Sequence, residues 1–275
     1  MSAGDYGTIN AIRRAMGVLE HLSAARHGLS VTELASASKL SKATVFRILA
    51  SLQGAGYVEQ DPQSQRYRLT LRIASLAFAF IDTMGFEDIC QPYLADLARE
   101  TGELVQLAVV QGDDMIFVAK AEGTQRVKLV PMLGRRVTLN ASAAGKVWLA
   151  SLAEEEAIRI VLKQGLPRLT GQTLTTVDAN RAEWARVRQQ GYATTVQEYW
   201  DDVNSVGAPI RVGTSRRVVA GITVAGPSSR FTLEIMRALA PRLVTVADTI
   251  ARMWPAWTEP LAAVAGETSP SPSTG

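Results

Sequence analysis

The segment GLSVTELASASKLSKATVFRILASLQGAGYV, residues 28–58, decides the fold of the first part of this 275-residue chain. Ser30 and Glu33 have the spacing of a capping box, because each side chain can satisfy a backbone amide of the other residue. The helix that they open should end near Ser38. A short turn follows, and Ser41 is a suitable N-cap for the next helix. Two helices joined by so tight a turn predict a helix-turn-helix unit.

The helix after Ser41 is amphipathic. Its apolar residues recur at helical spacing and should face a core; they are Val45, Ile48, Leu49 and Leu52. The opposite side exposes Ala43, Phe46, Arg47 and Ala50, with Lys42 and Thr44 near the N-terminus. Helix amides and the helix dipole attract phosphate there. This arrangement is typical of a recognition helix, whose first residues contact base edges in the DNA major groove.

Flanking elements extend the unit to about sixty residues. Apolar spacing predicts a first helix over residues 12–22, and glycines 54 and 56 end the recognition helix. Two short strands around the turn at residues 61–64 predict a hairpin wing. Arg66 and Arg68 should lie on its second strand, two residues apart and hence on one face, able to bind phosphate or enter a minor groove. The alternative is that these arginines are only solvated surface charges.

Composition favours a folded protein with two domains. Apolar residues make up 47% and charged residues 20% of the chain, and its length fits two domains. Residues 1–70 hold eight Lys/Arg against five Asp/Glu, whereas the remainder holds 21 of each. The excess positive charge therefore belongs to the DNA-binding part. We find no membrane-spanning run and no signal peptide, and expect a cytoplasmic protein.

Residue types exclude several kinds of site. Cys90 is the single cysteine and cannot form an internal disulfide, and both histidines, His21 and His27, lie in the first thirty residues. More than 240 following residues therefore offer no imidazole for base catalysis or metal binding. We expect no catalytic residue, no metal and no cofactor.

The rest of the chain predicts an α+β domain. Residues 71–84 form an apolar helix that should pack on a partner surface, and a second helix covers residues 86–101. A hairpin is expected over 103–121 and short strands at 127–130 and 137–139. Further helices are expected near 142–150, 154–164, 178–190 and 231–254, and strands at 192–196, 205–212 and 218–224. Strands grouped in hairpins indicate an antiparallel sheet.

Several phrases resemble one known family. RAMGVLEHL, the segment quoted above and YRL are similar to the winged helix-turn-helix of the IclR transcriptional regulators. RVTLNASAAGKVWLASL, VNSVGAPI and GITVAGPSSRF are similar to phrases of that family's effector-binding domain. The resemblance covers residues 8–254. It implies a winged helix-turn-helix over 8–70, a linker helix over 71–85, a GAF-like effector domain over 86–255 and a disordered tail over 256–275.

The same resemblance implies partners. A regulator of this type binds a near-palindromic operator in double-stranded DNA as a homodimer or a dimer of dimers. The residues expected to contact DNA are Ser30, Thr32, Ser41, Lys42, Ala43, Thr44, Phe46, Arg47, Arg66 and Arg68. One departure is Ala43, where the family commonly has a hydroxyl residue. Repression and activation are both compatible with this architecture.

A small-molecule effector is the second implied partner, a small carboxylate that is aromatic or aliphatic. The positions matched to the family pocket are Leu129, Val137, Ala143, Ala144, Thr195, Ser205, Thr223 and Ala225. Family members that bind very small keto acids tend to have an aspartate at the position of Thr195 and a hydroxyl residue at the position of Ala225. This chain lacks both polar groups, so a larger ligand is favoured. Candidate walls are Trp148, Tyr199 and Trp200, and candidate counter-charges are Arg126, Lys128, Arg135 and Arg136.

Three alternatives remain open from the residues alone. The small residues 142–145 either admit a carboxylate to helix amides or allow close packing of a helix on the sheet. Ser142 and Lys146, four residues apart on a helix, have the spacing of a serine/lysine hydrolase pair. The apolar helix at 71–84 could instead dock a protein, which would make the chain an interaction module without DNA binding.

Overall fold

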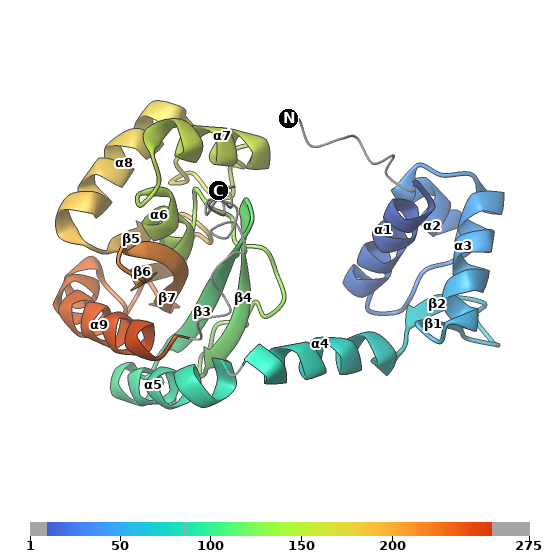
Figure 1. Cartoon of the computed structure of the whole chain (residues 1–275), viewed down its shortest axis with the longest axis horizontal. Coiled ribbons are helices and arrows are strands. Elements are labelled where there is room, and N and C mark those ends of the chain that lie inside the picture. Colours follow the sequence, from blue (N-terminus) through green and yellow to red (C-terminus); the bar gives the residue numbers. More distant parts are fainter. Residues whose placement is uncertain (1–9, 85, 255–275) are drawn as a thin grey trace, which may run out of the picture. The chain divides into compact units, whose positions relative to one another are not determined.

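The computed structural model describes residues 10–84 and 86–254, which divide into two compact units (Figure 1). One unit extends to Met84 and the other follows it. The expected tail at 256–275 and the domain-boundary residues 8, 9, 85 and 255 lie outside the described residues.

The first unit is a helix-turn-helix with a two-stranded wing (Figure 1). Its elements are α1 (Asn10–Ala24), α2 (Val31–Ser38), α3 (Lys42–Gly54), β1 (Val58–Gln60), β2 (Tyr67–Leu69) and α4 (Leu71–Met84). The capping box at Ser30 and Glu33 and the N-cap at Ser41 are confirmed. The core of this unit comprises Val18, Leu22, Leu34, Ala35, Val45, Leu49, Val58 and Tyr67.

The wing is tied to the start of the helix-turn-helix. Leu29 and Tyr67 exchange backbone hydrogen bonds of 2.9 and 2.8 Å, which attach β2 to the chain before α2. Gly28 makes this approach possible: its φ is +66°, and a Cβ there would lie 2.4 Å from the Tyr67 carbonyl oxygen. The turn glycine is therefore required by both backbone conformation and contact.

The second unit is an α+β domain with an antiparallel five-stranded sheet of order β4-β3-β7-β6-β5. This confirms the predicted fold class. Its helices are α5 (Phe86–Thr101), α6 (Ala143–Leu149), α7 (Glu154–Gln164), α8 (Val177–Gln190) and α9 (Leu233–Met253). Its strands are β3 (Leu104–Gln111), β4 (Asp114–Ala121), β5 (Ala193–Val196), β6 (Val203–Val212) and β7 (Arg217–Pro227).

Helices cover the two faces of the sheet differently. The long helices α5 and α9 pack on one face, and the short helix α6 packs on the other (Figure 1). Gly207 on β6 and Gly221 on β7 allow α6 to approach, since a Cβ on them would lie 3.0 and 3.2 Å from the Cβ atoms of Ala143 and Ala144 respectively. The small residues of α6 thus serve close packing, one of the two roles left open above.

Two predicted strands are absent from the described chain. Residues 127–130 and 137–139 are not strands; the segment has only a bridge between Ile116 and Arg136 and a bond from the Val137 amide to the Met115 carbonyl. Pro131 has no amide to donate, and Gly134 has a φ of +73°, so a regular ladder is broken here. Among the described helices, none has the length and apolar character to span a bilayer.

Candidate functional site

The exposed face of α3 is the first candidate site. Lys42, Ala43, Phe46, Arg47 and Ala50 are exposed on it, as predicted. Thr44 is half-buried, and its hydroxyl lies 2.8 Å from the Ser41 hydroxyl, which accepts the Thr44 amide as the helix cap. Phe46 is 58% exposed on the same face.

Cations around α3 differ in their pairing. Within residues 10–84, neither Lys42 nor Arg47 has an acidic side chain at ion-pair distance, so both charges are available to phosphate or base edges. Arg68 on the wing donates to Glu59 at 2.7 Å, but both side chains are more than half exposed. A surface pair of this kind contributes about 0–1 kcal/mol and can exchange for a DNA phosphate.

Arg66 differs from the sequence-based expectation. It precedes β2 rather than lying on it, and its guanidinium donates to the Gly28 carbonyl at 3.1 and 3.2 Å and to Glu33 at 2.8 Å. It therefore braces the wing against the cap of α2 and does not share a strand face with Arg68. This partner, 33 residues away, explains why strand alternation alone misplaced the side chain.

The residues that cap α2 are likewise engaged in hydrogen bonds within the first unit. The Ser30 amide donates to Glu33 at 2.7 Å, and the Ser30 hydroxyl both donates to and accepts from that residue. These bonds, with the Arg66 guanidinium, lower the pKa of Glu33 to about 2. Thr32 is exposed beside this cluster. Ser30 thus has a structural role before any contact with DNA.

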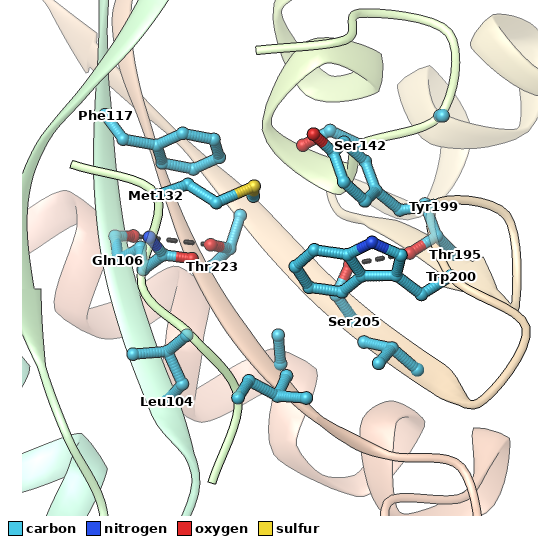
Figure 2. Close-up of a pocket in the computed structure, with 14 residues that line it drawn as sticks. Leu104, Gln106, Phe117, Met132, Ser142, Thr195, Tyr199, Trp200, Ser205 and Thr223 are labelled. Atoms are coloured by element: carbon cyan, nitrogen blue, oxygen red, sulfur yellow. Dashed lines mark hydrogen bonds between the residues drawn. The ribbon is translucent and has the colours of Figure 1, made fainter. Parts of the chain in front are cut away.

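A cavity in the second unit is the other candidate site. It encloses about 460 Å³, part of it open to solvent, on the face of the sheet that carries α6 (Figure 2). The sheet register builds its floor in two rows, since residues two apart on a strand share a face. One row is Leu104, Ala225, Ser205 and Thr195, and the next begins with Gln106 and Thr223.

Loops complete the cavity. Leu129 and Met132 come from the segment after β4, and Tyr199 and Trp200 come from the loop between β5 and β6. Figure 2 shows Met132, Phe117 and Gln106 on one side and Tyr199 and Trp200 on the other. The remaining lining residues are Ala141, Ser142 and Val203. The walls are thus mostly apolar, with aromatic rings on both sides.

Every lining side chain is uncharged. The polar ones are Gln106, Ser142, Thr195, Ser205 and Thr223, with the Tyr199 hydroxyl and the Trp200 indole N–H on the aromatic wall. The Thr195 and Ser205 hydroxyls lie 2.6 Å apart. The candidate counter-charges lie outside the lining: Lys128 and Arg136 pair with Glu122 and Asp114, and Arg126 and Arg135 are exposed. A ligand would therefore meet neutral donors rather than a cation.

The structure brings together five of the eight residues matched to an effector pocket, namely Leu129, Thr195, Ser205, Thr223 and Ala225. The other three, Val137, Ala143 and Ala144, are buried in the adjacent core and do not line the cavity. Trp148 is also in that core, whereas Tyr199 and Trp200 line the cavity. Sequence reasoning missed Gln106, although a single polar residue within the apolar run LVQLAVV was a usable signal.

A buried ion cluster adjoins the cavity. Lys146 on α6 is 1% exposed, and its Nζ donates to Glu198 at 2.6 Å, to Glu183 at 3.3 Å and to the Thr194 carbonyl at 3.4 Å. Burial raises the pKa of Glu198 despite the opposing charge of Lys146. This cluster accounts for the Lys146 amine, which points to the two glutamates and is no base for Ser142. The serine/lysine hydrolase alternative is therefore wrong.

The surface of α4 is strongly apolar. Leu71 is 85% and Phe78 is 70% exposed, and Leu76 and Phe80 are each 58% exposed. Leu76 and Phe80 are four residues apart and share one face, whereas Leu71 and Phe78, seven apart, share another. Isolated exposed apolar residues are ordinary, but four large ones on a helix of fourteen residues, paired on each of two faces, indicate an interaction surface.

Comparisons with known proteins agree on one family. Residues 11–62 match the model of the IclR helix-turn-helix domain, and residues 78–252 match that of the bacterial transcriptional regulator IclR C-terminal domain. The HTH-type transcriptional repressor AllR of Salmonella typhi is 31% identical over 222 residues, 81% of each chain.

Solved structures have the same fold. An IclR-type regulator from a Silicibacter species superposes with a TM-score of 0.76 at 28% identity, covering 88% of this chain and 95% of that one. An IclR homologue from Microbacterium hydrocarbonoxydans, crystallised with 4-hydroxybenzoate, has a TM-score of 0.73 at 21% identity, covering 88% and 99%. At this identity the second likeness concerns the fold alone.

Proposed function

Because this chain belongs to the IclR family of DNA-binding transcriptional regulators, we propose that it binds a near-palindromic operator as a homodimer and responds to a small aromatic carboxylate. We further propose that it represses transcription, since the AllR relatives are named as transcriptional repressors. The proposal has three parts: the DNA contacts, the dimer and the effector.

The exposed, unpaired charge of α3 carries the DNA-binding part. Arg47 and Lys42 extend from the exposed face of a helix whose N-terminus is capped by Ser41. In this proposal Arg47 contacts base edges, where a bidentate contact discriminates between bases by about 1–3 kcal/mol. Lys42 and Arg68 bind backbone phosphates, which fix the position of the helix without reading sequence.

The apolar surface of α4 supports a homodimer. A near-palindromic operator needs two copies of α3 about 34 Å apart, or a multiple of this distance. The exposed side chains of Leu76 and Phe80, on one face of α4, supply apolar surface that a second copy of the same helix can bury. In this proposal α4 pairs with its equivalent, and a larger assembly would form from two such dimers.

The cavity supports the effector part. Its apolar and aromatic walls surround a few polar groups, which is the usual composition of a small-molecule site. The rings of Phe117 and Trp200 suit an aromatic ligand, and a fold relative was crystallised with 4-hydroxybenzoate. In this proposal a bound carboxylate changes operator affinity by a coupling free energy of about 1–3 kcal/mol.

Selection from random duplex DNA, followed by gel retention with the full chain, tests the DNA contacts. Arg47→Ala should lose preference for the selected sequence, whereas the matched control Arg68→Ala should weaken binding to all sequences similarly and reduce the salt dependence by about one unit of slope. If Arg47→Ala retained the selected DNA as wild type does, the assignment of α3 as recognition helix would be wrong.

Sedimentation of variants in α4 tests the dimer. The double substitution Leu76→Glu and Phe80→Glu should dissociate the protein, because two charges would enter the apolar contact. The control Ser75→Glu changes an exposed polar residue on the same helix and should leave the dimer intact. A dimer that persists in the double variant would contradict the proposed role of α4.

A further inference from the structure

Gln106 has an unusual environment. It lies on β3 between buried residues and is 3% exposed, and its side-chain Nε2 has no hydrogen-bond partner within residues 86–254. Buried amide donors are nearly always bonded, since an unpaired one loses its hydration without compensation. An unpaired buried donor that lines a cavity therefore needs an explanation in terms of what the cavity binds.

The polar neighbours of Gln106 are already engaged. The Thr195 and Ser205 hydroxyls are bonded to one another. The Thr223 hydroxyl donates to the backbone carbonyl of Gln106 at 3.4 Å and does not accept from the side-chain Nε2, which has no partner within residues 86–254. No carboxylate lines the cavity, so the lining offers the Nε2 donor no charged acceptor. The missing acceptor is one that a ligand can bring.

The walls restrict the rest of the ligand. Gln106 and Thr223 lie on the side of Phe117 and Met132, and Trp200 lies opposite (Figure 2). A flat ring fits between apolar and aromatic walls, and its polar end can then reach Nε2. Because all lining side chains are neutral, a multiply charged phosphate would lack counter-charge, and a cation would meet no anion.

We propose that Gln106 recognises the polar end of the effector, donating its Nε2–H to a carboxylate oxygen of a singly charged aromatic acid whose ring lies against Phe117, Met132 and Trp200. This inference rests on the proposed effector role of the cavity. Under this proposal Gln106 favours ligands whose polar end accepts a hydrogen bond. A neutral amide, and not an arginine or lysine, then recognises the carboxylate.

Calorimetry on the full chain tests the proposal with two monosubstituted benzenes of opposite charge, benzoate and benzylamine. Wild type should bind benzoate and not benzylamine. Gln106→Leu should weaken benzoate about 10- to 100-fold, the usual loss for a bond to a charged group. Gln106→Glu should lose benzoate and gain benzylamine, a reversal that misfolding cannot produce. The control is Gln111→Leu, which changes an exposed glutamine on the same strand.

Melting of the ligand-free variants separates a binding role from a structural one. Gln106→Leu should melt at or above the wild-type temperature, because it removes an unpaired buried donor. Equal benzoate affinity in wild type and Gln106→Leu would overturn this inference and leave the effector function standing. Failure of wild type to bind benzoate, with operator binding intact, would overturn the aromatic-carboxylate function and this inference together.

Discussion

Replacing Lys146 by Met should destabilise the second unit strongly and in a pH-dependent way. The substitution keeps the length of the side chain and removes a charge that is 1% exposed. Glu183 keeps its two bonds from Arg186, at 2.7 and 2.9 Å. Glu198 loses its 2.6 Å partner, and its other carboxylate oxygen, Oε2, is already buried without a hydrogen bond within the described residues. The cost therefore falls mainly on Glu198.

Protonation of Glu198 sets the size of this cost. A carboxyl group with an ordinary pKa of 4.5 is protonated at a cost of about 1.4 kcal/mol for each pH unit above that value, hence about 4 kcal/mol at pH 7.5. This value agrees with the roughly 3–5 kcal/mol lost when one partner of a buried pair is removed. At pH 5.5 the same reasoning predicts a loss of only about 1.4 kcal/mol.

Urea unfolding followed by tryptophan fluorescence measures the loss of unfolding free energy in the second unit, because all five tryptophans follow residue 147. The control Lys163→Met removes a lysine that is 67% exposed and pairs with Asp113 at 2.8 Å; it should cost less than about 1 kcal/mol. Adding Glu198→Gln to Lys146→Met should recover most of the loss at pH 7.5. Equal destabilisation by both lysine variants, or a loss independent of pH, would refute the reasoning.

Three further predictions concern other parts of the chain. Cys90 is fully buried and burial raises the pKa of its thiol to about 12, so a thiol reagent at pH 8 should label it only as fast as the chain unfolds; fast labelling of native protein would contradict this. Gly145→Ala would place a Cβ 2.4 Å from Leu139 backbone atoms and should cost about 1–3 kcal/mol in urea unfolding, whereas Gly171→Ala, with open space around it, should cost far less. The pKa of Glu33 in the folded state is about 2, against an ordinary 4.5. Ionised Glu33 therefore stabilises the first unit above pH 4.5, and this contribution is lost as the pH falls towards 2. In thermal melts followed by circular dichroism, the melting temperatures of wild type and Glu33→Gln should converge over that range, and a constant difference would contradict the prediction.

Local signals in the sequence predicted the first unit well. The capping box at Ser30 and the N-cap at Ser41 depend on bonds that span three residues, so the residues themselves specify them. The apolar spacing of α3 likewise predicted that Val45 and Leu49 are buried, because one helix face is set by its own periodicity. Such features need no knowledge of distant parts of the chain.

Features that depend on distant residues were harder to predict. Arg66 is held by Glu33, which strand alternation cannot reveal. Gln106 faces Thr223 only because β3 pairs with β7 in one register, across 117 residues of sequence. The resemblance to a family supplied Thr195 and Thr223 as site residues, but it supplied the core residues Ala143 and Ala144 beside them as well. Distinguishing lining from core residues required the packing of α6 on the sheet.

The position of the cavity follows from where that packing stops. Helix α6 lies on the sheet where Gly207 and Gly221 leave room for its alanines, and it is only seven residues long. The row of Leu104, Ala225, Ser205 and Thr195 lies beyond these glycines, and loop residues such as Met132 and Trp200 complete its walls. The loop that carries Trp200 also carries Glu198, which Lys146 holds to α6. Helix α6 therefore has two effects on the cavity. Its alanines cover the sheet up to the edge of the cavity floor, and its Lys146 holds the loop that forms one wall. A ligand that fills the cavity would contact Tyr199 and Trp200, which directly follow the glutamate that Lys146 holds.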